Sequence, residues 1–266
     1  MKKISTLSIG NSFSEDACAY LHQIAESAGI NLECTNLYIG GCSLEAHAAN
    51  LKSGEKKYEL QINGVKTDKF VSIPEMLDSD FDIVTLQQAS HFSGMPDTYY
   101  PYINELADAV RGAIPGAKLW IHETWAYEVD STHGAFVNYH SSQREMYERM
   151  RDAYSMAAER INAPIIPVGD AIQYVRENAP EFDYKNGGAS LNRDGFHLSI
   201  PLGRCFADYV WLETLCGVDA REALHVPDGM SEADTGLLVK LRGYAHDYVN
   251  NSKYNVYPIS WTKYKK

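Results

Sequence analysis

The chain has 266 residues, of which 45% are hydrophobic and 22% are charged, and its formal net charge is −11. This hydrophobic content is enough for one domain with a large core, while the acidic balance, without a lysine and arginine cluster, argues against binding to nucleic acid. No segment approaches the roughly 18 consecutive apolar residues of a membrane-spanning helix, so we expect no membrane partner.

The first predicted unit is a buried strand, a sharp turn and a helix. Residues 4–9 form a mostly apolar run without charge, which is typical of a strand inside an α/β sheet. Gly10 permits a sharp exit, and residues 14–16 supply the N-cap and first-turn side chains of a helix that continues to Ala25. The unit places the Ser12 hydroxyl at the carboxyl edge of the sheet, which suits a nucleophile and also an ordinary turn serine.

The next elements are a second strand and a hairpin. Residues 32–38 read as the strand, which runs into Gly40 and Gly41, where the backbone can approach another group closely. A short helix over 44–51 follows. The alternation around Asn63-Gly64 predicts a β-hairpin at about residues 56–71. We expect this hairpin to be an insertion on the edge of the core, where it could cover the site.

The remaining chain alternates between strands and helices, which predicts a parallel sheet with helices on both faces. No internal repeat or linker is visible, so we expect residues 1–266 to form a single domain. An extra C-terminal helix, at about 231–249, precedes an irregular tail containing Trp261. The predicted strands cover 81–88, 118–124 and 164–168, and the predicted helices cover 73–77, 102–114, 142–160, 171–177, 201–215 and 231–249.

Asp194 and His197 are the best candidates for partners of Ser12. They are three residues apart in a polar loop before a C-terminal helix, so the carboxylate can orient the imidazole. If that loop lies at the same edge of the sheet as Ser12, the imidazole can remove the proton of the serine hydroxyl. The pair could otherwise be a capping aspartate beside a surface histidine.

Acyl transfer by such a serine also needs hydrogen-bond donors for the oxyanion. The backbone N–H groups of Ser12 and Gly41 are candidates, together with the side-chain amide of Gln87 or Gln88, with Gln87 preferred. Each donor would lower the barrier by about 3 kcal/mol. The two glutamines could equally satisfy backbone groups at the end of their strand.

At these residues the sequence resembles the SGNH, or GDSL, hydrolase superfamily. Gly10-Asn11-Ser12 is similar to its Gly-Asp-Ser block, with Asn replacing Asp, and Gly40-Gly41 matches the block whose glycine N–H serves the oxyanion hole. Asp194-Gly195-Phe196-His197 matches its Asp-x-x-His block. The usual Gly-x-Asn-Asp block is replaced here by Leu86-Gln87-Gln88-Ala89-Ser90, which is similar to the glutamine of carbohydrate and sialate O-acetylesterase branches.

The resemblance implies both a fold and an assignment of roles. The fold would be a flavodoxin-like α/β/α three-layer sandwich with a parallel sheet of about five strands, and neither a metal nor an organic cofactor would be needed. Ser12, His197 and Asp194 would be the catalytic triad. Ser12, Gly41 and Gln87 would form the oxyanion hole.

Other side chains are candidates for contact with substrate. We expect Asn11, Ser90, Trp125 and Tyr127 to be near it, since aromatic residues in loops after strand ends can stack on a sugar ring, although Trp125 could also belong to the core. The histidines His122, His133 and His140 match no familiar metal-ligand spacing, and we interpret them as solvated or core-edge residues.

The five cysteines are an odd number without metal-type spacing, which fits free thiols in a reducing compartment. The start of the chain, Met1-Lys2-Lys3 and a short stretch broken by serines, does not resemble a secretory signal, so we expect a cytoplasmic location. A nucleophilic role for Cys42 is a weak alternative, because a cysteine beside a double glycine usually serves packing. The cysteines are Cys18, Cys34, Cys42, Cys205 and Cys216.

Our first functional hypothesis is a serine esterase that removes an acetyl or other short acyl group from a carbohydrate. A second is a thioesterase or lysophospholipase-type lipase with the same triad. A third, from another class, is a flavodoxin-like module that binds a phosphate or nucleotide at the first helix, and a fourth is a non-catalytic scaffold. The sequence predicts no oligomeric state.

Overall fold

A seven-stranded mixed sheet forms the centre of the computed structural model, which describes residues 3–251. The spatial order of the strands is β4-β3-β2-β1-β5-β6-β7. In chain order the strands are β1 (Ile4–Gly10), β2 (Leu32–Tyr38), β3 (Tyr58–Ile62), β4 (Val65–Val71), β5 (Ile83–Leu86), β6 (Lys118–His122) and β7 (Ile165–Ile166).

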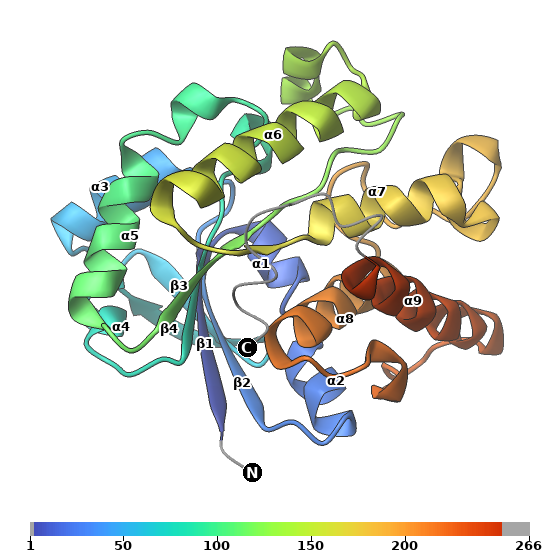
Figure 1. Ribbon diagram of the computed structural model, residues 1–266, viewed down its shortest axis with the longest axis horizontal. Coiled ribbons are helices and arrows are strands. Elements are labelled where there is room, and N and C mark those ends of the chain that lie inside the picture. The colour runs from blue at the N-terminus through green and yellow to red at the C-terminus, as the bar shows by residue number, and fades with distance from the viewer. Residues whose placement is uncertain (1–2, 252–266) are drawn as a thin grey trace.

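Helices cover both faces of this sheet. In Figure 1, α3, α4 and α5 lie on one side and α2, α8 and α9 on the other, and α6 packs against α5 and α7. The α-helices are α1 (Ser12–Asp16), α2 (Leu21–Ser27), α3 (Leu44–Ser53), α4 (Ile73–Leu77), α5 (Tyr102–Ala113), α6 (Gln143–Ile161), α7 (Val168–Asn178), α8 (Leu202–Cys216) and α9 (Glu232–Asn250). Short 3-10 helices are η1 (Ser90–Phe92), η2 (Pro96–Thr98), η3 (Gly134–Tyr139), η4 (Pro180–Phe182), η5 (Tyr184–Asn186) and η6 (Ala220–Glu222).

The five parallel strands confirm the predicted flavodoxin-like architecture. These strands are β2, β1, β5, β6 and β7 in spatial order, because β1 pairs with both β2 and β5, β5 pairs with β6, and β6 pairs with β7. If only these five are numbered along the chain, the order is 2-1-3-4-5, as in flavodoxin. The strand order reverses at β1, and in open α/β sheets ligands bind beside the carboxyl ends of strands at such a point. The end of β1 is therefore the expected position of a site.

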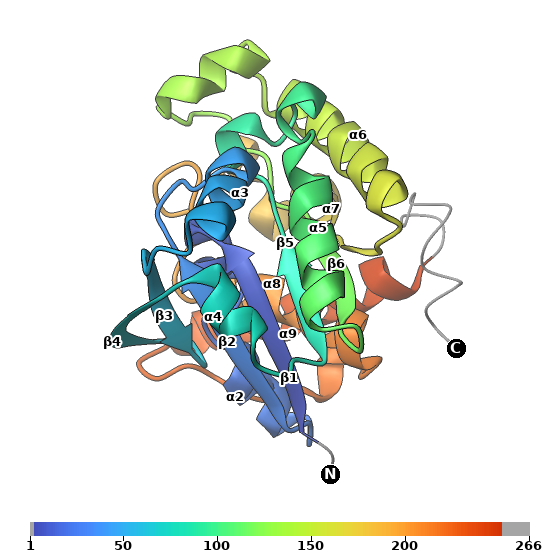
Figure 2. The same ribbon diagram turned by 90° about the vertical axis from the view of Figure 1, so that its left-hand side faces the viewer.

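The hairpin takes the predicted place at the edge of the core, but it does so as part of the sheet. Asn63 and Gly64 form its turn with φ angles of 53° and 79°, as the sequence predicts for this pair. However, β3 pairs antiparallel with β2, so the hairpin extends the sheet to seven strands and forms its edge (Figure 2). It is not an insertion that covers the site. The alternating pattern predicts two strands correctly, but it carries no information about which strand they join.

The first predicted helix is divided into two. The structure ends α1 at Asp16 and begins α2 at Leu21, where a single helix to Ala25 was expected. The Asp16 carboxylate is fully buried and accepts hydrogen bonds from a distant loop, and the backbone N–H of Tyr20 donates to Asp208 Oδ2 at 3.0 Å. Tertiary hydrogen bonds therefore replace those of a continuous helix here.

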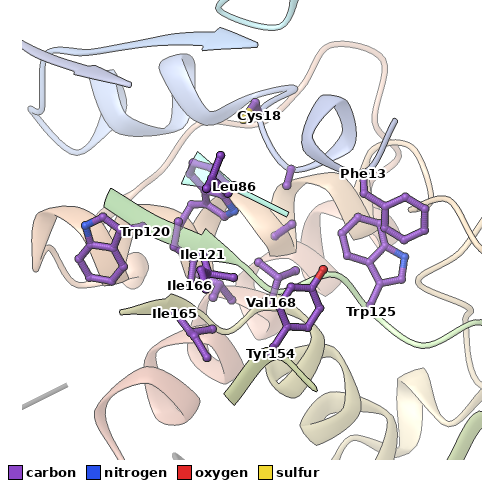
Figure 3. Close-up of a cluster of buried hydrophobic side chains, with 14 of the residues drawn as sticks. Phe13, Cys18, Leu86, Trp120, Ile121, Trp125, Tyr154, Ile165, Ile166 and Val168 are labelled. Carbon is purple, nitrogen blue, oxygen red and sulfur yellow. The ribbon is translucent and has the colours of Figure 1, made fainter. Parts of the chain in front are cut away.

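Several other boundaries differ by a few residues. The strand predicted over 81–88 is shorter, and β7 has two residues because α7 already begins at Val168. Buried side chains from β5, β6, β7 and α6 pack together in one part of the core (Figure 3). Among residues 3–251, none of the helices combines the length and the apolar character that crossing a bilayer requires. Trp261 lies outside the described residues.

Candidate active site

Ser12 stands at the first position of α1, directly after β1. Asn11 is the N-cap of this helix, and its side chain accepts a hydrogen bond from the backbone N–H of Phe13 at 2.9 Å. Gly10 leaves no room for a side chain, because a Cβ there would lie 2.2 Å from Ser14 Oγ. The sequence Gly-Asn-Ser thus makes a tight strand-to-helix turn that presents the serine hydroxyl.

The predicted partners of Ser12 meet it in one hydrogen-bonded chain. His197 Nε2 lies 2.9 Å from Ser12 Oγ, and His197 Nδ1 lies 2.7 Å from Asp194 Oδ2. The histidine side chain is 20% exposed and the aspartate side chain 41% exposed, so the chain of groups opens to solvent. Residues 185 positions apart in the sequence therefore meet at the carboxyl end of β1.

The environment of Asp194 keeps it ionised. Partial burial raises the pKa of this carboxyl, but hydrogen bonds from the His197 ring and backbone, together with the backbone N–H of Phe196, outweigh it and hold the pKa below its ordinary value. The carboxylate therefore accepts a proton on His197 Nδ1, which leaves Nε2 free to accept the proton of Ser12. This arrangement can perform nucleophilic and general-base chemistry.

Asp16, at the other end of α1, joins the serine helix to the loop that carries His197. Its buried carboxylate accepts the backbone N–H of Leu198 at 2.8 Å and forms ion pairs with Arg193 and Arg204 at 3.0 and 2.8 Å. One short helix therefore presents Ser12 and also anchors the loop of His197. The sequence pattern predicts only a first-turn position for Asp16.

Trp125 supports the same loop from below. Its indole Nε1 donates to the backbone carbonyl of Phe196 at 2.7 Å, and its ring stacks on Phe13 with a centroid distance of 4.3 Å (Figure 3). The side chain is fully buried. The prediction that Trp125 contacts substrate is therefore wrong, and the alternative that it belongs to the core is confirmed.

Asn11 also has a structural rather than an exposed position. Its side chain is 1% exposed, donates to the carbonyl of Cys42 at 3.0 Å and accepts from Gln87 Nε2 at 2.7 Å. This burial argues against the predicted contact with substrate, and the side chain instead ties the turn at Ser12 to the loop after β2. Gly41 in that loop is exposed, with a φ of +64° and open space where a side chain would stand.

Both glutamines after β5 are buried and hydrogen-bonded to neighbouring elements. Gln87 is 2% exposed, and besides holding Asn11 it accepts a hydrogen bond from His122 Nδ1 at 2.9 Å. Gln88 is fully buried; its Oε1 accepts from the Leu44 N–H at 3.0 Å, and its Nε2 donates to the carbonyl of Thr98 at 2.9 Å. Both amides thus have partners within the framework, and the role of either one in an oxyanion hole stays a prediction.

Ser90 and Tyr127, predicted to contact substrate, contact each other. Their hydroxyl oxygens are 3.0 Å apart, and the two side chains are 6% and 0% exposed. They too are part of the framework. Cys42 is no competitor for Ser12, because burial raises the pKa of its thiol to about 11 and keeps it protonated. All five cysteines are free thiols, as the sequence predicts.

Three residues beside the triad were not predicted to belong to the site: His91, His133 and Phe196. The ring centroid of Phe196 lies 4.1 Å from that of His197 and 4.8 Å from that of His133, and the His91 ring is 6.4 Å from His133. All three are partly exposed. Only the position of His91 and His133 in loops after strands, at the carboxyl edge of the sheet, could have indicated their place.

One cluster in residues 3–251 has donor atoms close enough to hold a metal ion. It consists of Glu213 in α8, Asp219 at the start of η6 and His246 in α9. His246 Nδ1 lies 2.8 Å from the Glu213 carboxylate, and Arg221 pairs with Asp219. The guanidinium beside Asp219 already balances its charge. Neither Ser12 nor its partners belong to this cluster.

Comparisons with known proteins identify a family and a solved structure with the same fold. The sequence model of a family described as "Domain of unknown function (DUF4886)" matches residues 4–245. The solved structure of a DUF4886 family protein from Bacteroides uniformis is 34% identical, covers 93% of this chain and 95% of its own, and has a TM-score of 0.84. Among curated proteins, none matches the chain.

More distant structures share the architecture. A candidate SGNH hydrolase from Slackia heliotrinireducens is 23% identical, with a TM-score of 0.53 and coverage of 80% of this chain and 100% of its own. An acetylxylan esterase from Geobacillus stearothermophilus is 13% identical, with a TM-score of 0.50 and coverage of 79% and 93%. At these identities the likeness establishes the α/β fold of SGNH hydrolases.

Proposed function

The chain belongs to the DUF4886 family, and we propose that it is a serine hydrolase that cleaves carboxylic esters. The observation that carries the proposal is the hydrogen-bonded chain from Ser12 through His197 to Asp194, with distances of 2.9 and 2.7 Å. A serine hydroxyl is a weak nucleophile until a base removes its proton, and this geometry supplies the base and the group that orients it. The likeness in fold to SGNH hydrolases supports the same conclusion.

In the proposed mechanism, His197 takes the proton of Ser12 as the serine oxygen attacks the ester carbonyl. The backbone N–H groups of Ser12 and Gly41 donate to the oxyanion that forms, each lowering the barrier by about 3 kcal/mol. His197 then gives its proton to the departing alcohol oxygen, leaving an acyl group on Ser12. Water, deprotonated by His197, attacks this acyl group, and His197 returns the proton to Ser12 Oγ as the bond from the acyl carbon to Oγ breaks and the acid is released. Asp194 stabilises the imidazolium at both stages.

We propose a short acyl group, such as acetyl, and a carbohydrate alcohol. Phe13, the residue after the nucleophile, is buried and stacks on Trp125, so aromatic packing occupies the interior below Ser12. A long acyl chain needs an apolar channel at that place. A likeness in fold to an acetylxylan esterase favours the same substrate class, and a thioesterase or long-chain lipase is the alternative that acyl-length specificity would reveal.

A phosphate-binding module has less support. Such a module would use the free N–H groups at the start of α1, but the Asn11 side chain already caps this helix. The Ser12 hydroxyl is likewise engaged with His197. Neither Asp194 nor His197 would have a role in phosphate binding.

The proposal is tested by hydrolysis of p-nitrophenyl acetate with the wild type and Ser12→Ala. We expect the variant to lose at least about 10³-fold in kcat, as removal of a triad nucleophile does, with an unchanged circular dichroism spectrum. Ser53→Ala, at the exposed end of α3, is the matched control and should keep full activity. A Ser12→Ala variant that hydrolyses the ester at the wild-type rate would eliminate the mechanism. Comparison of acetate with octanoate esters tests the short acyl group.

A further inference from the structure

We propose that His133, with Phe196 and His91, forms a subsite for the alcohol part of the ester, and that this subsite selects alcohols with a free hydroxyl near the ester oxygen. We call these three residues the alcohol subsite. The inference rests on the proposed function and deepens it, because it assigns substrate contacts to residues outside the triad. Its substrate class is a neutral polyol ester, such as a partly acetylated sugar.

The alcohol subsite is held against the triad by the backbone. The N–H of Glu128 donates to the carbonyl of Gly195 at 2.8 Å, in the middle of the loop between Asp194 and His197. Gly195 has a φ of +84°, and a Cβ there would lie 2.9 Å from the Cα of Ser131. The segment that leads to His133 therefore rests directly on the loop of the catalytic histidine.

The side chains continue this contact. The ring of His133 meets that of Phe196 nearly edge to face, at 73° and 4.8 Å, and Phe196 in turn lies against His197 with a centroid distance of 4.1 Å. All three residues are partly exposed, and their rings contact one another in sequence from His133 through Phe196 to His197. His91 extends it, with its ring tilted by 19° from that of His133.

The hydrogen bonds of His133 define what it can offer to a ligand. Its Nδ1 accepts the backbone N–H of Ala135 at 3.1 Å, so in the neutral ring the proton is on Nε2. Burial, together with the nearby His197, lowers the pKa of His133 despite the opposing effect of Asp194, which keeps the ring neutral at pH 7. Within residues 3–251, Nε2 has no hydrogen-bond partner. His133 therefore presents an uncharged N–H donor.

The reaction geometry places the alcohol on this side. His197 Nε2 must come within hydrogen-bonding distance of the leaving oxygen to protonate it, so the alcohol lies beside the imidazole. The proposed oxyanion donors come instead from the start of α1 and the loop after β2, which Asn11 joins. A substrate hydroxyl next to the ester oxygen can then accept from His133 while its ring carbons pack on Phe196. The exposed carboxylate of Asp194 disfavours an anionic alcohol.

The test compares two acetates with six-membered rings: a methyl xyloside monoacetate, which carries free hydroxyls, and cyclohexyl acetate, which carries none. We expect the wild type to have the higher kcat/KM for the sugar ester. His133→Ser keeps an N-cap oxygen for Ala135 but removes the ring donor, and His133→Phe keeps a ring and removes the donor. Each should reduce the ratio of the two kcat/KM values about tenfold, the size of one neutral hydrogen bond. Two different replacements separate loss of the donor from a local folding defect.

His140→Asn is the control, since His140 lies at the exposed end of the same 3-10 segment and pairs with Glu145. It should leave the ratio unchanged. A wild type that hydrolyses cyclohexyl acetate and p-nitrophenyl acetate but no sugar acetate would overturn the inference and leave the esterase proposal intact. An unchanged ratio in both His133 variants would also overturn it. A wild type inactive on every ester would instead contradict the proposed function.

Discussion

Asp16→Asn tests whether the short helix α1 controls the position of His197. The Asp16 carboxylate is fully buried and is shared by Arg193, Arg204 and the backbone N–H of Leu198. An asparagine has nearly the same shape but no charge, and its amide nitrogen must face one of these donors. The substitution therefore leaves two guanidinium groups without their counter-ion.

The expected loss of stability follows from this geometry. Breaking a buried ion pair from one side costs about 3–5 kcal/mol. The Arg193 and Arg204 side chains are 31% and 19% exposed, so water can solvate them in part, and we expect a loss of about 2–4 kcal/mol in the free energy of unfolding. The loop of His197 should also shift relative to Ser12, so that kcat falls about 10–100-fold even where the protein is folded.

The assay combines urea unfolding with p-nitrophenyl acetate hydrolysis at a temperature where all variants are folded. Asp208→Asn is a matched control, because Asp208 is also fully buried, burial raises the pKa of its carboxyl, and its Oδ2 accepts the backbone N–H of Tyr20 at 3.0 Å. That control should stay within about 1 kcal/mol of the wild type. Wild-type stability and rate in Asp16→Asn, or equal losses in both variants, would refute the reasoning.

Two further predictions concern the framework. Trp125→Phe removes the hydrogen bond to the Phe196 carbonyl while keeping an aromatic ring. We therefore expect the free energy of unfolding in urea to fall by about 1–3 kcal/mol and kcat to be reduced. A variant equal to the wild type in both measurements would contradict a supporting role for Trp125. Burial raises the pKa of Asp170 to about 6, although hydrogen bonds from Tyr147 and Tyr248 oppose it, so the folded state holds this proton more tightly than the unfolded state. This tighter proton binding stabilises the folded state fully below about pH 4, and the stabilisation is lost as the pH rises through 6. The free energy of unfolding of the wild type, relative to that of Asp170→Asn, should therefore fall by roughly 2–3 kcal/mol between pH 4 and 7. A difference that stays constant with pH would contradict the raised pKa of Asp170.

The sequence predicted the parts of the fold that depend on local patterns. Strand β2 and helix α4 have the expected bounds, and the Asn63-Gly64 turn has the expected conformation. The triad contact was also predicted, because the spacing of Asp194 and His197 and the topology of an α/β sheet together restrict where the groups can lie. These features arise from residues close in sequence or from general rules of α/β folds.

The features that were missed depend on contacts between distant segments. The hairpin alternates in the same way whether it pairs with β2 or folds over the site, so its place could not be read from its pattern. Gln87, Trp125 and Tyr127 are polar or amphipathic residues after strand ends, where exposed and buried positions look alike in sequence. His133 gained its position from the contact between Ser131 and Gly195, for which no local signal exists.

Active-site labelling with a fluorophosphonate, followed by mass spectrometry of the modified peptide, tests the role of Ser12 most directly. The hydrogen bond from Ser12 to His197 predicts one adduct per folded molecule, on Ser12, and a rate of labelling that falls by at least about 10²-fold in His197→Ala. Folded wild-type protein that stays unlabelled, or that carries the adduct on another residue, would contradict the assignment of Ser12 as the nucleophile.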